Sequence, residues 1–417
     1  MPGSFYFNPD PVCAPMAVTP SKEKPLRCLV GPDTVRMLQL GHPWVIADRY
    51  TARWPQAPCG GLAELVDEKG TLLGTALLDP GARVVARLLA SGAFSLDVSW
   101  IAARLAAAEQ VRSWLDPGDT TAWRLVNGEG DGLPGLTIDR YGDDLLVQYY
   151  TRGWEPHLSV VVSALQRRYQ PRAIYAKFRP QQTRGKDGDV KGRLLSGRRE
   201  SGLQVVVEQG LRFRVDLENE LHTGLFLDQR ENRRAFRQLA AGQRVLNLFA
   251  YTGAFSVAAA AGGARQVTTV DAAPRYLEWA RENFRLNGLD PSVHSFIAGD
   301  CFAELARLAG SGCRYDVILM DPPSFSTVRD SRFTTSGGTA ELVGLALALL
   351  PAGGLLITSS NHQKIDLADY LKELRRGALA AGRELRVVGT AGQGGDFPYP
   401  VTFPEGRYLK YVVSVAE

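Results

Sequence analysis

Short apolar runs alternate with helical patterns through the second half of the chain. Each run is long enough for one strand, and each is followed by residues whose apolar positions recur at helical spacing. Strands and helices that alternate in this way form a mainly parallel sheet with helices on both faces. The expected strands cover residues 245–249, 266–270, 295–298, 316–320 and 354–358. The pattern therefore predicts an α/β fold for this part of the chain.

The first part of the chain has the pattern of a small, mostly β unit. Extended runs at 62–66 and 84–89 are separated by turn signals, and one helix is expected over 32–40. Residues 1–25 precede this unit. They are rich in proline and lack the basic start and the apolar run of a signal peptide or membrane anchor. We expect a flexible tail over 1–25 and a first domain over 26–94.

A central α+β domain is expected over 95–202. It begins with a helix at 95–114, whose apolar residues Ile101, Leu105, Ala108 and Val111 are spaced for one helical face. Strands are expected at 123–127, 136–141 and 145–150, and a second helix at 158–169. A hairpin formed by 203–207 and 211–217 then opens the third domain, 203–417.

Composition excludes several classes of protein. The chain has 417 residues, and 48 Lys and Arg against 44 Asp and Glu leave a formal charge of only +4, unlike a polycationic nucleic-acid coat. Five cysteines form no Cys-x-x-Cys pair, which argues against a disulfide-rich secreted protein or a zinc ribbon. No apolar run approaches the length of a membrane span. We therefore expect a cytoplasmic protein with no metal site and no membrane partner.

One segment departs from this balance. Residues 167–200 hold eleven basic side chains and three acidic ones, a surplus of +8 that exceeds the net charge of the whole chain. Tyr169, Tyr175 and Phe178 lie among them. Basic and aromatic side chains together can contact phosphates and stack on unpaired bases, whereas a charge run alone is usually a solvated surface. Both interpretations stay open at this point.

The loops that follow the predicted parallel strands carry the candidate cofactor residues. Gly253 follows the first strand, Asp271 ends the second, Asp300 follows the third, and Asp321-Pro-Pro follows the fourth. Neither G-x-G-x-x-G nor G-x-x-x-x-G-K-[ST] occurs, which argues against a dinucleotide and against a phosphate loop. A glycine bend, an acid for ribose hydroxyls and an acid for an adenine amino group fit S-adenosylmethionine (SAM).

Five sequence motifs carry a resemblance to a known family. They are Gly41-His-Pro-Trp44, the stretch from Asn127 to Gly135, the stretch from His222 to Arg233, Asp321-Pro-Pro-Ser-Phe325 and the stretch from Phe403 to Lys410. Together the chain from Leu26 onward resembles the bacterial large-subunit rRNA methyltransferases of the RlmI (YccW) type, which methylate cytosine at carbon 5. The resemblance implies a PUA-like RNA-binding β-barrel first and a Rossmann-like class I methyltransferase domain last, with SAM as cofactor and ribosomal RNA as partner. A homodimer is possible.

The resemblance also implies roles for the cofactor residues. Tyr251, Thr252 and Gly253 would flank the methionine part of SAM, Asp271 the ribose and Asp300 the adenine. The matching stretch that contains Gln229 and Arg230 would lie along the cofactor pocket. For Arg230, Arg233 and Arg234, a solvated helix face is an equally good interpretation.

The same resemblance assigns the reacting base to the Asp321 turn. Asp321 and the Pro322 carbonyl would hold the edge of a flipped-out base, and Phe325 would pack on its face. Ser359, in the turn after a late strand, stands where the family has its catalytic cysteine. Carbon-5 methylation needs a nucleophile at carbon 6, and a serine hydroxyl needs a base to act as one, for which His362 is the nearest candidate.

The serine leaves three alternatives to carbon-5 chemistry. Methylation at a nitrogen needs no covalent nucleophile, and Ser359-Ser-Asn361 resembles the Ser-Asn-Asn turn of a guanine-N7 rRNA methyltransferase domain. A chain without catalysis could persist as an rRNA-binding assembly factor. A small-molecule methyltransferase is the third alternative, and two additional N-terminal domains argue against it.

Overall fold

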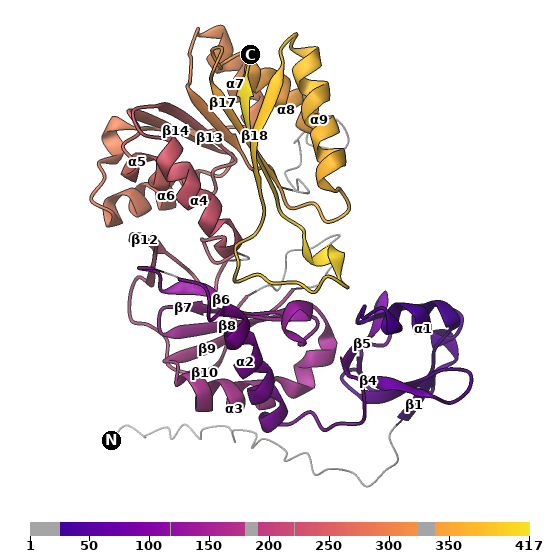
Figure 1. Cartoon of the computed structure of the whole chain (residues 1–417). Helices are drawn as coiled ribbons and strands as arrows, with labels where there is room; N and C mark the ends of the chain where they lie inside the picture. Colours follow the sequence, from indigo (N-terminus) through magenta and orange to yellow (C-terminus); the bar gives the residue numbers. More distant parts are fainter. Residues whose placement is uncertain (1–25, 117, 180–190, 221, 324–337) are drawn as a thin grey trace, which may run out of the picture.

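The computed structural model describes residues 26–116, 118–179, 191–220, 222–323 and 338–417. In these residues it has two five-stranded sheets, a two-stranded hairpin and a seven-stranded sheet. Figure 1 shows the first sheet at the lower right, the second beside it and the seven-stranded sheet above both. No helix in the described ranges is long and apolar enough to span a membrane.

The first unit is built on a sheet with the strand order β1-β3-β4-β5-β2. Its core contains Cys28, Val45, Leu65 and Ala76, all fully buried. Proline at the first position of α1 starts the helix with the φ angle that a helix requires. The elements are β1 (Leu26–Leu29), α1 (Pro32–Gln39), β2 (Trp44–Ile46), η1 (Thr51–Arg53), β3 (Leu62–Val66), β4 (Leu72–Leu78) and β5 (Val84–Ala90).

The central unit has the strand order β10-β9-β8-β7-β6, with α2 and α3 packed together against it. One expectation for α2 was wrong: Val111 is 44% exposed, while Arg112 is buried in its place. Position 112 continues the face of Leu105 and Ala108, and an ion pair with Asp131 compensates the buried guanidinium of Arg112. The elements are α2 (Val98–Arg112), β6 (Ala122–Asn127), η2 (Gly128–Asp131), β7 (Leu136–Tyr141), β8 (Asp144–Tyr149), η3 (Arg152–His157), α3 (Leu158–Tyr169), β9 (Ala173–Phe178) and β10 (Arg193–Gly197).

The third unit begins with a hairpin and continues into the seven-stranded sheet, whose order is β15-β14-β13-β16-β17-β19-β18. The first five strands of this order are parallel, as predicted, and β19 is antiparallel to both of its neighbours. Its strands and hairpin are β11 (Val205–Glu208), β12 (Leu211–Arg214), β13 (Arg244–Leu248), β14 (Gln266–Asp271), β15 (Ser295–Ala298), β16 (Val317–Met320), β17 (Leu355–Ser360), β18 (Leu385–Ala391) and β19 (Lys410–Ala416). Its helices are η4 (Leu227–Gln229), α4 (Arg230–Leu239), α5 (Ala254–Ala261), α6 (Pro274–Leu286), η5 (Pro291–Val293), α7 (Cys301–Gly310), α8 (Gly338–Leu347), α9 (Leu367–Ala380) and η6 (Pro404–Gly406).

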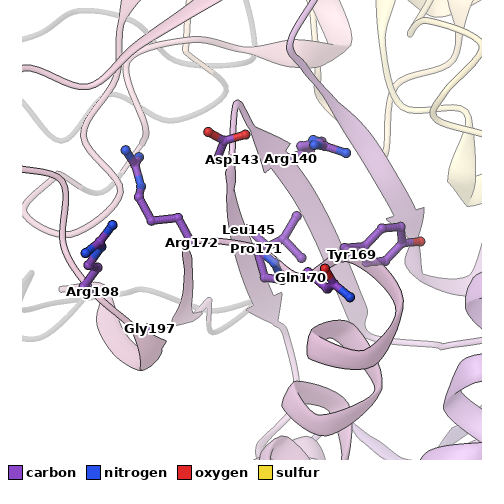
Figure 2. Close-up of a pocket in the computed structure, with 9 residues that line it drawn as sticks. All are labelled: Arg140, Asp143, Leu145, Tyr169, Gln170, Pro171, Arg172, Gly197 and Arg198. Carbon is purple, nitrogen blue, oxygen red and sulfur yellow. The ribbon is translucent and has the colours of Figure 1, made fainter.

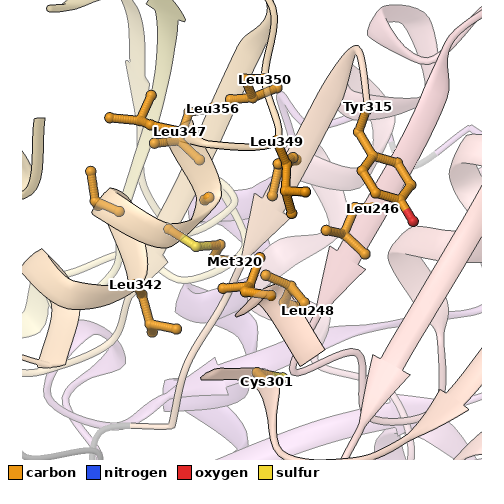
Figure 3. Packing of buried hydrophobic residues seen from close by; sticks show 14 of the residues in the cluster. Leu246, Leu248, Cys301, Tyr315, Met320, Leu342, Leu347, Leu349, Leu350 and Leu356 are labelled. Atoms are coloured by element: carbon orange, nitrogen blue, oxygen red, sulfur yellow. The ribbon is translucent and has the colours of Figure 1, made fainter. Parts of the chain in front are cut away.

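Successive residues of the strands face opposite sides of this sheet, and each side has its own core. Leu246 and Leu248 of β13 pack with Met320 and Leu356 in one cluster (Figure 3), to which α7, α8 and α9 also contribute buried residues. Val245 packs on the other side, in a cluster with residues of α4 and α5. Because both faces are covered, the strands read as short continuous apolar runs.

The strand order reverses between β13 and β16. From β13 the chain moves outward through β14 and β15, and it returns to the other side of β13 with β16 and β17. In such a sheet the crevice at the carboxyl ends of the two central strands is where ligands bind. The loops that begin at Phe249 and Asp321 leave this crevice.

Candidate functional site

The loop after β13 has a strained backbone. Phe249, Tyr251 and Gly253 have φ angles of 56°, 51° and 74°. Two side chains other than glycine in this region are unusual, and strain of this kind is concentrated at ligand-binding sites. Asp271 stabilises the loop, because its Oδ2 accepts a hydrogen bond from the backbone nitrogen of Tyr251 at 2.8 Å.

Gly253 is required by packing between helices. A Cβ atom at this position would lie 2.6 Å from the Cβ of Ala280 on α6. The sequence suggested that the glycine lets a ligand approach the backbone. The structure shows instead that it lets α5 and α6 approach each other, and this packing sets the direction in which the loop leaves β13.

Asp271 combines a structural role with free acceptor capacity. Its Oδ1 accepts a hydrogen bond from the nitrogen of Ala273 at 2.9 Å, and each carboxylate oxygen still has a lone pair available. Burial raises the pKa of Asp271 above its usual value. The carboxylate at the end of β14 is suited to accept hydrogen bonds from two neighbouring hydroxyls, as a ribose presents.

Aromatic side chains surround the Tyr251 loop. The ring centroid of Tyr251 lies 4.5 Å from that of Tyr276 and 5.4 Å from that of Phe226. Phe226 is 38% exposed, so the cluster presents an apolar surface beside Asp271. Thr252 is already engaged, since its hydroxyl donates to the carbonyl of Gly224 at 2.6 Å. An apolar surface next to a carboxylate fits a sulfonium nucleoside.

Asp300 lies at the start of α7 and caps it. Its Oδ1 accepts hydrogen bonds from the nitrogens of Phe302 and Ala303, both at 3.1 Å. The residue is exposed, and its second carboxylate oxygen has no hydrogen bond within the described residues. A cap through one oxygen is compatible with recognition of an adenine amino group by the other.

The structure brings three of the predicted site residues into direct contact. The Gln229 amide nitrogen donates to the Ser359 hydroxyl at 2.9 Å and to Oδ2 of Asp321 at 3.2 Å. Asn232 orients this amide, because its own nitrogen donates to the Gln229 oxygen at 2.7 Å. Gln229 and Ser359 are 3% and 1% exposed, so water competes little for these bonds. A buried amide thus connects the ends of β16 and β17 to α4.

Asp321 has an unusual acidity for a carboxylate. Burial and, to a smaller extent, the charge of Asp228 raise its pKa to about 6, against the opposing effect of a hydrogen bond from Ser359. Above this pH the residue is a carboxylate that can accept hydrogen bonds from a donor at the site. Pro322 follows it directly at the carboxyl end of β16. Phe325 lies outside the described residues.

Ser359 is not in a turn, as the sequence suggested, but inside β17. The strand continues to Ser360 because it pairs with β19, where Ser359 lies opposite Tyr411. Its hydroxyl contacts Gln229 and Asp321, and its carbonyl accepts from the Tyr370 hydroxyl at 3.2 Å. In the described part of the chain, no hydrogen bond connects the His362 side chain to Ser359. The partners that the structure gives the Ser359 hydroxyl are Gln229 and Asp321.

Two arginines of the stretch from His222 to Arg233 form buried ion pairs. Arg230 pairs with Asp396 at 2.7 Å and Arg233 with Glu208 at 2.6 Å, and both arginines are 3% exposed. Arg234 remains on the solvated face of α4. The sequence had left open whether these arginines bind a ligand. Arg230 and Arg233 instead connect α4 to other parts of the chain.

A pair close to the site was missed by the sequence analysis. The Tyr408 hydroxyl donates to Oδ2 of Asp228 at 2.7 Å, next to Gln229 in the chain. The two residues are 180 positions apart, and no periodicity connects them. The stretch from Phe403 to Lys410, which carried part of the resemblance, was the one available signal.

A separate cavity of about 500 Å³ lies on the central unit, as Figure 2 shows. It contains none of the predicted site residues, and α3, β7, β8 and β10 surround it. Its lining residues are Arg140, Asp143, Leu145, Tyr169, Gln170, Pro171, Arg172, Gly197 and Arg198. Arg172 is already paired with Asp144.

Comparison with known proteins identifies the family. A model described as S-adenosylmethionine-dependent methyltransferase matches residues 139–398, and a PUA-like domain model matches residues 29–91. The ribosomal RNA large subunit methyltransferase I of Escherichia coli O139:H28 is 34% identical over 388 residues, which cover 92% of this chain and 98% of the relative. The protein of the same name from Erwinia tasmaniensis is 35% identical over the same shares of both chains.

Solved structures agree with this assignment. SMU.776, crystallised with SAH, superposes with a TM-score of 0.84 at 29% identity, over 94% of this chain and all of the other. A second structure, from Streptococcus mutans, has a TM-score of 0.81 at 29% identity and the same coverage. The strained loop, the Asp271 carboxylate and the aromatic cluster fit SAM as the cofactor. The chain belongs to the S-adenosylmethionine-dependent methyltransferases and, among them, to the family of ribosomal RNA large subunit methyltransferase I.

Proposed function

We propose that the protein methylates a base of large-subunit (23S) ribosomal RNA, with SAM as the methyl donor. The relatives' name supports this substrate, and a PUA-like first domain supports RNA binding. The observation that carries the proposal is the contact of Gln229 with both Ser359 and Asp321, at the crevice where the cofactor residues also lie. We divide the chain into the domains 26–94, 95–202 and 203–417, and we expect it to act in the cytoplasm.

The cofactor residues have distinct tasks in this proposal. SAM supplies a methyl group on a positively charged sulfur, which a nucleophilic atom of the base attacks. Asp271 holds the ribose, Asp300 holds the adenine amino group, and the loop of Tyr251, Thr252 and Gly253 lies against the methionine part. Gln229 reaches the crevice from the side of α4.

The reacting base would lie between Asp321, Pro322, Phe325 and Ser359. Architecture favours carbon 5 of cytosine as the nominal target. The cytosine amino group can donate hydrogen bonds to the Asp321 carboxylate and to the Pro322 carbonyl. Exclusion of water by the bound base would strengthen both hydrogen bonds.

Methylation at a nitrogen is the second candidate, and one observation favours it. The Gln229 amide donates to the Ser359 oxygen and therefore occupies one of its two lone pairs, which makes the hydroxyl a poorer nucleophile. Ser359 then acts as a hydrogen-bonding partner of Asp321. The carboxylate is available to accept a proton where the methylated nitrogen carries one, as an amino nitrogen does, whereas methylation of guanine N7 releases none. A binding protein without catalysis is the remaining alternative.

Labelled SAM and unmodified ribosomal RNA separate these alternatives. Transfer of label to the RNA, followed by nuclease digestion and mass analysis, identifies the base and the atom. Ser359→Cys is expected to accelerate carbon-5 transfer and Ser359→Ala to abolish it, whereas transfer to nitrogen should depend only weakly on either change. If the RNA binds but gains no label, the protein is an RNA-binding protein without catalysis.

Cofactor binding provides an independent test. Asp271→Ala removes the acceptor for the ribose hydroxyls, so calorimetry should show SAM affinity reduced by about 10- to 100-fold. Asp290→Ala is the control, because Asp290 caps η5 and takes no part in the proposed site. Equal SAM affinity in the two variants would contradict the assignment of Asp271.

A further inference from the structure

The connection between β18 and β19, residues 392–409, contacts both other units of the chain. Figure 1 shows it in yellow, extending from the seven-stranded sheet toward the units below. The Phe403 ring lies 4.9 Å from that of Trp44 and 5.2 Å from that of His42 in the first unit. The Trp44 indole also donates to Glu129 of the central unit at 2.7 Å. Three of the five family motifs therefore meet at this junction.

Asp396 anchors the connection near its start. The residue is 1% exposed, and its carboxylate accepts hydrogen bonds from Arg230 at 2.7 and 3.1 Å and from the backbone nitrogen of Arg124 at 2.9 Å. Its carbonyl accepts from Arg112 at 2.9 Å. One residue thus joins the connection to α4, β6 and α2.

Tyr408 anchors the other end against the turn η4. Its hydroxyl donates to Asp228 at 2.7 Å, and its carbonyl accepts from the Lys410 ammonium at 2.8 Å. The Gly394 nitrogen donates to the Asp228 carbonyl at 3.3 Å. The connection therefore holds both the side chain and the backbone of Asp228.

Asp228 immediately precedes Gln229, the residue that contacts Ser359 and Asp321. Asn232 strengthens this link, since its amide donates to Gln229 and also to the Gly392 carbonyl at 3.2 Å. A shift of Asp228 would move the Gln229 backbone, and a short amide side chain has little reach to compensate.

We propose that Tyr408 is a positioning residue for methyl transfer, which fixes Gln229 against Ser359 and Asp321 by holding Asp228. The inference rests on the proposed function, which assigns those residues to the reacting site. The contacts of Phe403 with Trp44 and His42 steady the connection that carries Tyr408. The first unit thereby supports the same turn without touching the site.

Tyr408→Phe tests this role by removing one hydroxyl. Displacement of reacting groups by about 1 Å can reduce the rate of the chemical step by roughly 100-fold. We expect kcat for methyl transfer to rRNA to fall by about 10- to 100-fold, while the KM for RNA and the SAM affinity measured by calorimetry stay within about twofold of wild type. A general loss of structure would change all three values and the unfolding temperature.

Tyr399→Phe is the matched control. Tyr399 lies in the same connection and is 39% exposed, and its hydroxyl has no hydrogen bond within the described residues. This variant should retain the wild-type kcat. A Tyr408→Phe enzyme that is indistinguishable from Tyr399→Phe would overturn the inference.

Asp228→Ala removes the other partner of the same hydrogen bond. It should reduce kcat at least as far as Tyr408→Phe, and the double variant should be no slower than Asp228→Ala, because both changes break one link. If Tyr408→Phe does not fold, the kcat of Asp228→Ala is the test. A wild-type kcat in that variant overturns the inference. A wild-type enzyme that neither binds SAM nor methylates rRNA would instead refute the proposed function.

Discussion

Asp321 shows how a single residue can serve a reaction at the expense of stability. Its carboxylate lies at the carboxyl end of β16, where burial opposes ionisation and, among the described residues, Gln229 and Ser359 provide hydrogen bonds. The strained Tyr251 loop is a second case at this scale, since Asp271 and the packing around Gly253 must hold a backbone that most residues avoid. In both cases the surrounding contacts are those of a preformed site.

Asp321→Asn is predicted to stabilise the folded protein and to slow methyl transfer. The pKa of Asp321 rises from 3.8 to about 6 on folding, so its ionised form destabilises the folded state. The penalty is absent below pH 3.8, grows up to about pH 6 and is complete above it. Asparagine should therefore raise the free energy of unfolding by about 1–3 kcal/mol at pH 8.

Denaturant unfolding at pH 8 and at pH 4 checks this prediction, and most of the gain should be lost at the lower pH, which lies just above 3.8. Methyl transfer should fall in the variant above about pH 6, because a neutral amide is a weaker acceptor than the carboxylate that the wild type carries there. Activity of the wild type should decline below about pH 6, as the Asp321 carboxylate becomes protonated. A gain in stability that is equal at both pH values would contradict the role of burial.

At the scale of elements, two buried ion pairs hold α4 in place. Arg233 pairs through two bonds with Glu208 of β11, and Arg230 pairs with Asp396. Both arginines belong to a helix whose opposite face is solvated. The helix is therefore fixed in position on the side from which Gln229 enters the site.

Arg233→Ala and Arg234→Ala compare a buried and an exposed arginine on the same helix. Removal of Arg233 leaves the Glu208 carboxylate buried without its partner, and breaking such a pair costs about 3–5 kcal/mol. Arg234 is 59% exposed in its side chain and lies 3.8 Å from Glu231, so its loss should cost less than about 0.5 kcal/mol. Chemical denaturation of the two variants measures the difference, and similar values would show that the Glu208 pair does not stabilise α4.

Periodicity and turn signals located most elements, while contacts distant in sequence did not follow from them. The five parallel strands and α3 match their predicted ranges to within about two residues. Ser359 was placed in a turn because the pairing of β17 with β19 depends on residues about fifty positions later. Val111 was placed in the core because the sequence does not show that Asp131 compensates a buried Arg112.

The candidate site was also predictable only in part, because local patterns locate some of its residues and contacts distant in sequence locate the others. Asp271, Asp300 and Asp321 follow strands, and the carboxyl ends of parallel strands meet at one edge. The Gln229 contacts and the Tyr408–Asp228 bond need the fold itself, since they join residues that are at least 92 positions apart. The helix cap at Asp300 is a local interaction, but an Asp between a strand and a helix is expected equally for a cap and for a ligand-binding residue.

At the scale of the whole molecule, the charge surplus of residues 167–200 is smaller than it looks in the sequence. Arg168, Arg172 and Arg199 form ion pairs with acids, and Lys177 is 1% exposed. Of the described residues in this segment, four cations are exposed and form no ion pair with another described residue: Arg167, Lys191, Arg193 and Arg198. Among the described residues, the basic surface available to RNA is therefore smaller than the charge count of the segment suggests.

Arg167→Ala/Arg198→Ala should weaken rRNA binding and flatten its dependence on salt. Each phosphate contact that is lost lowers the slope of log affinity against log salt by about 0.7 to 0.9. Filter binding at several salt concentrations measures this slope. Lys372→Ala/Arg376→Ala on α9 is the control, because both cations are paired with acids in the third unit. Equal slopes for the two double variants would exclude Arg167 and Arg198 as phosphate contacts.

The junction at Phe403 has a consequence for how this architecture can evolve. An added Cβ at Gly130 would meet the Pro398 carbonyl at 2.0 Å, and one at Gly41 would meet Thr402 at 3.0 Å. The third unit thus has a surface that fits both neighbouring units. A protein in which another RNA-binding module replaced the N-terminal half would have a poorly fitting interface along the connection that holds Asp228, next to Gln229. Selection on turnover would then preserve all three units as one heritable block, even where the RNA target changes.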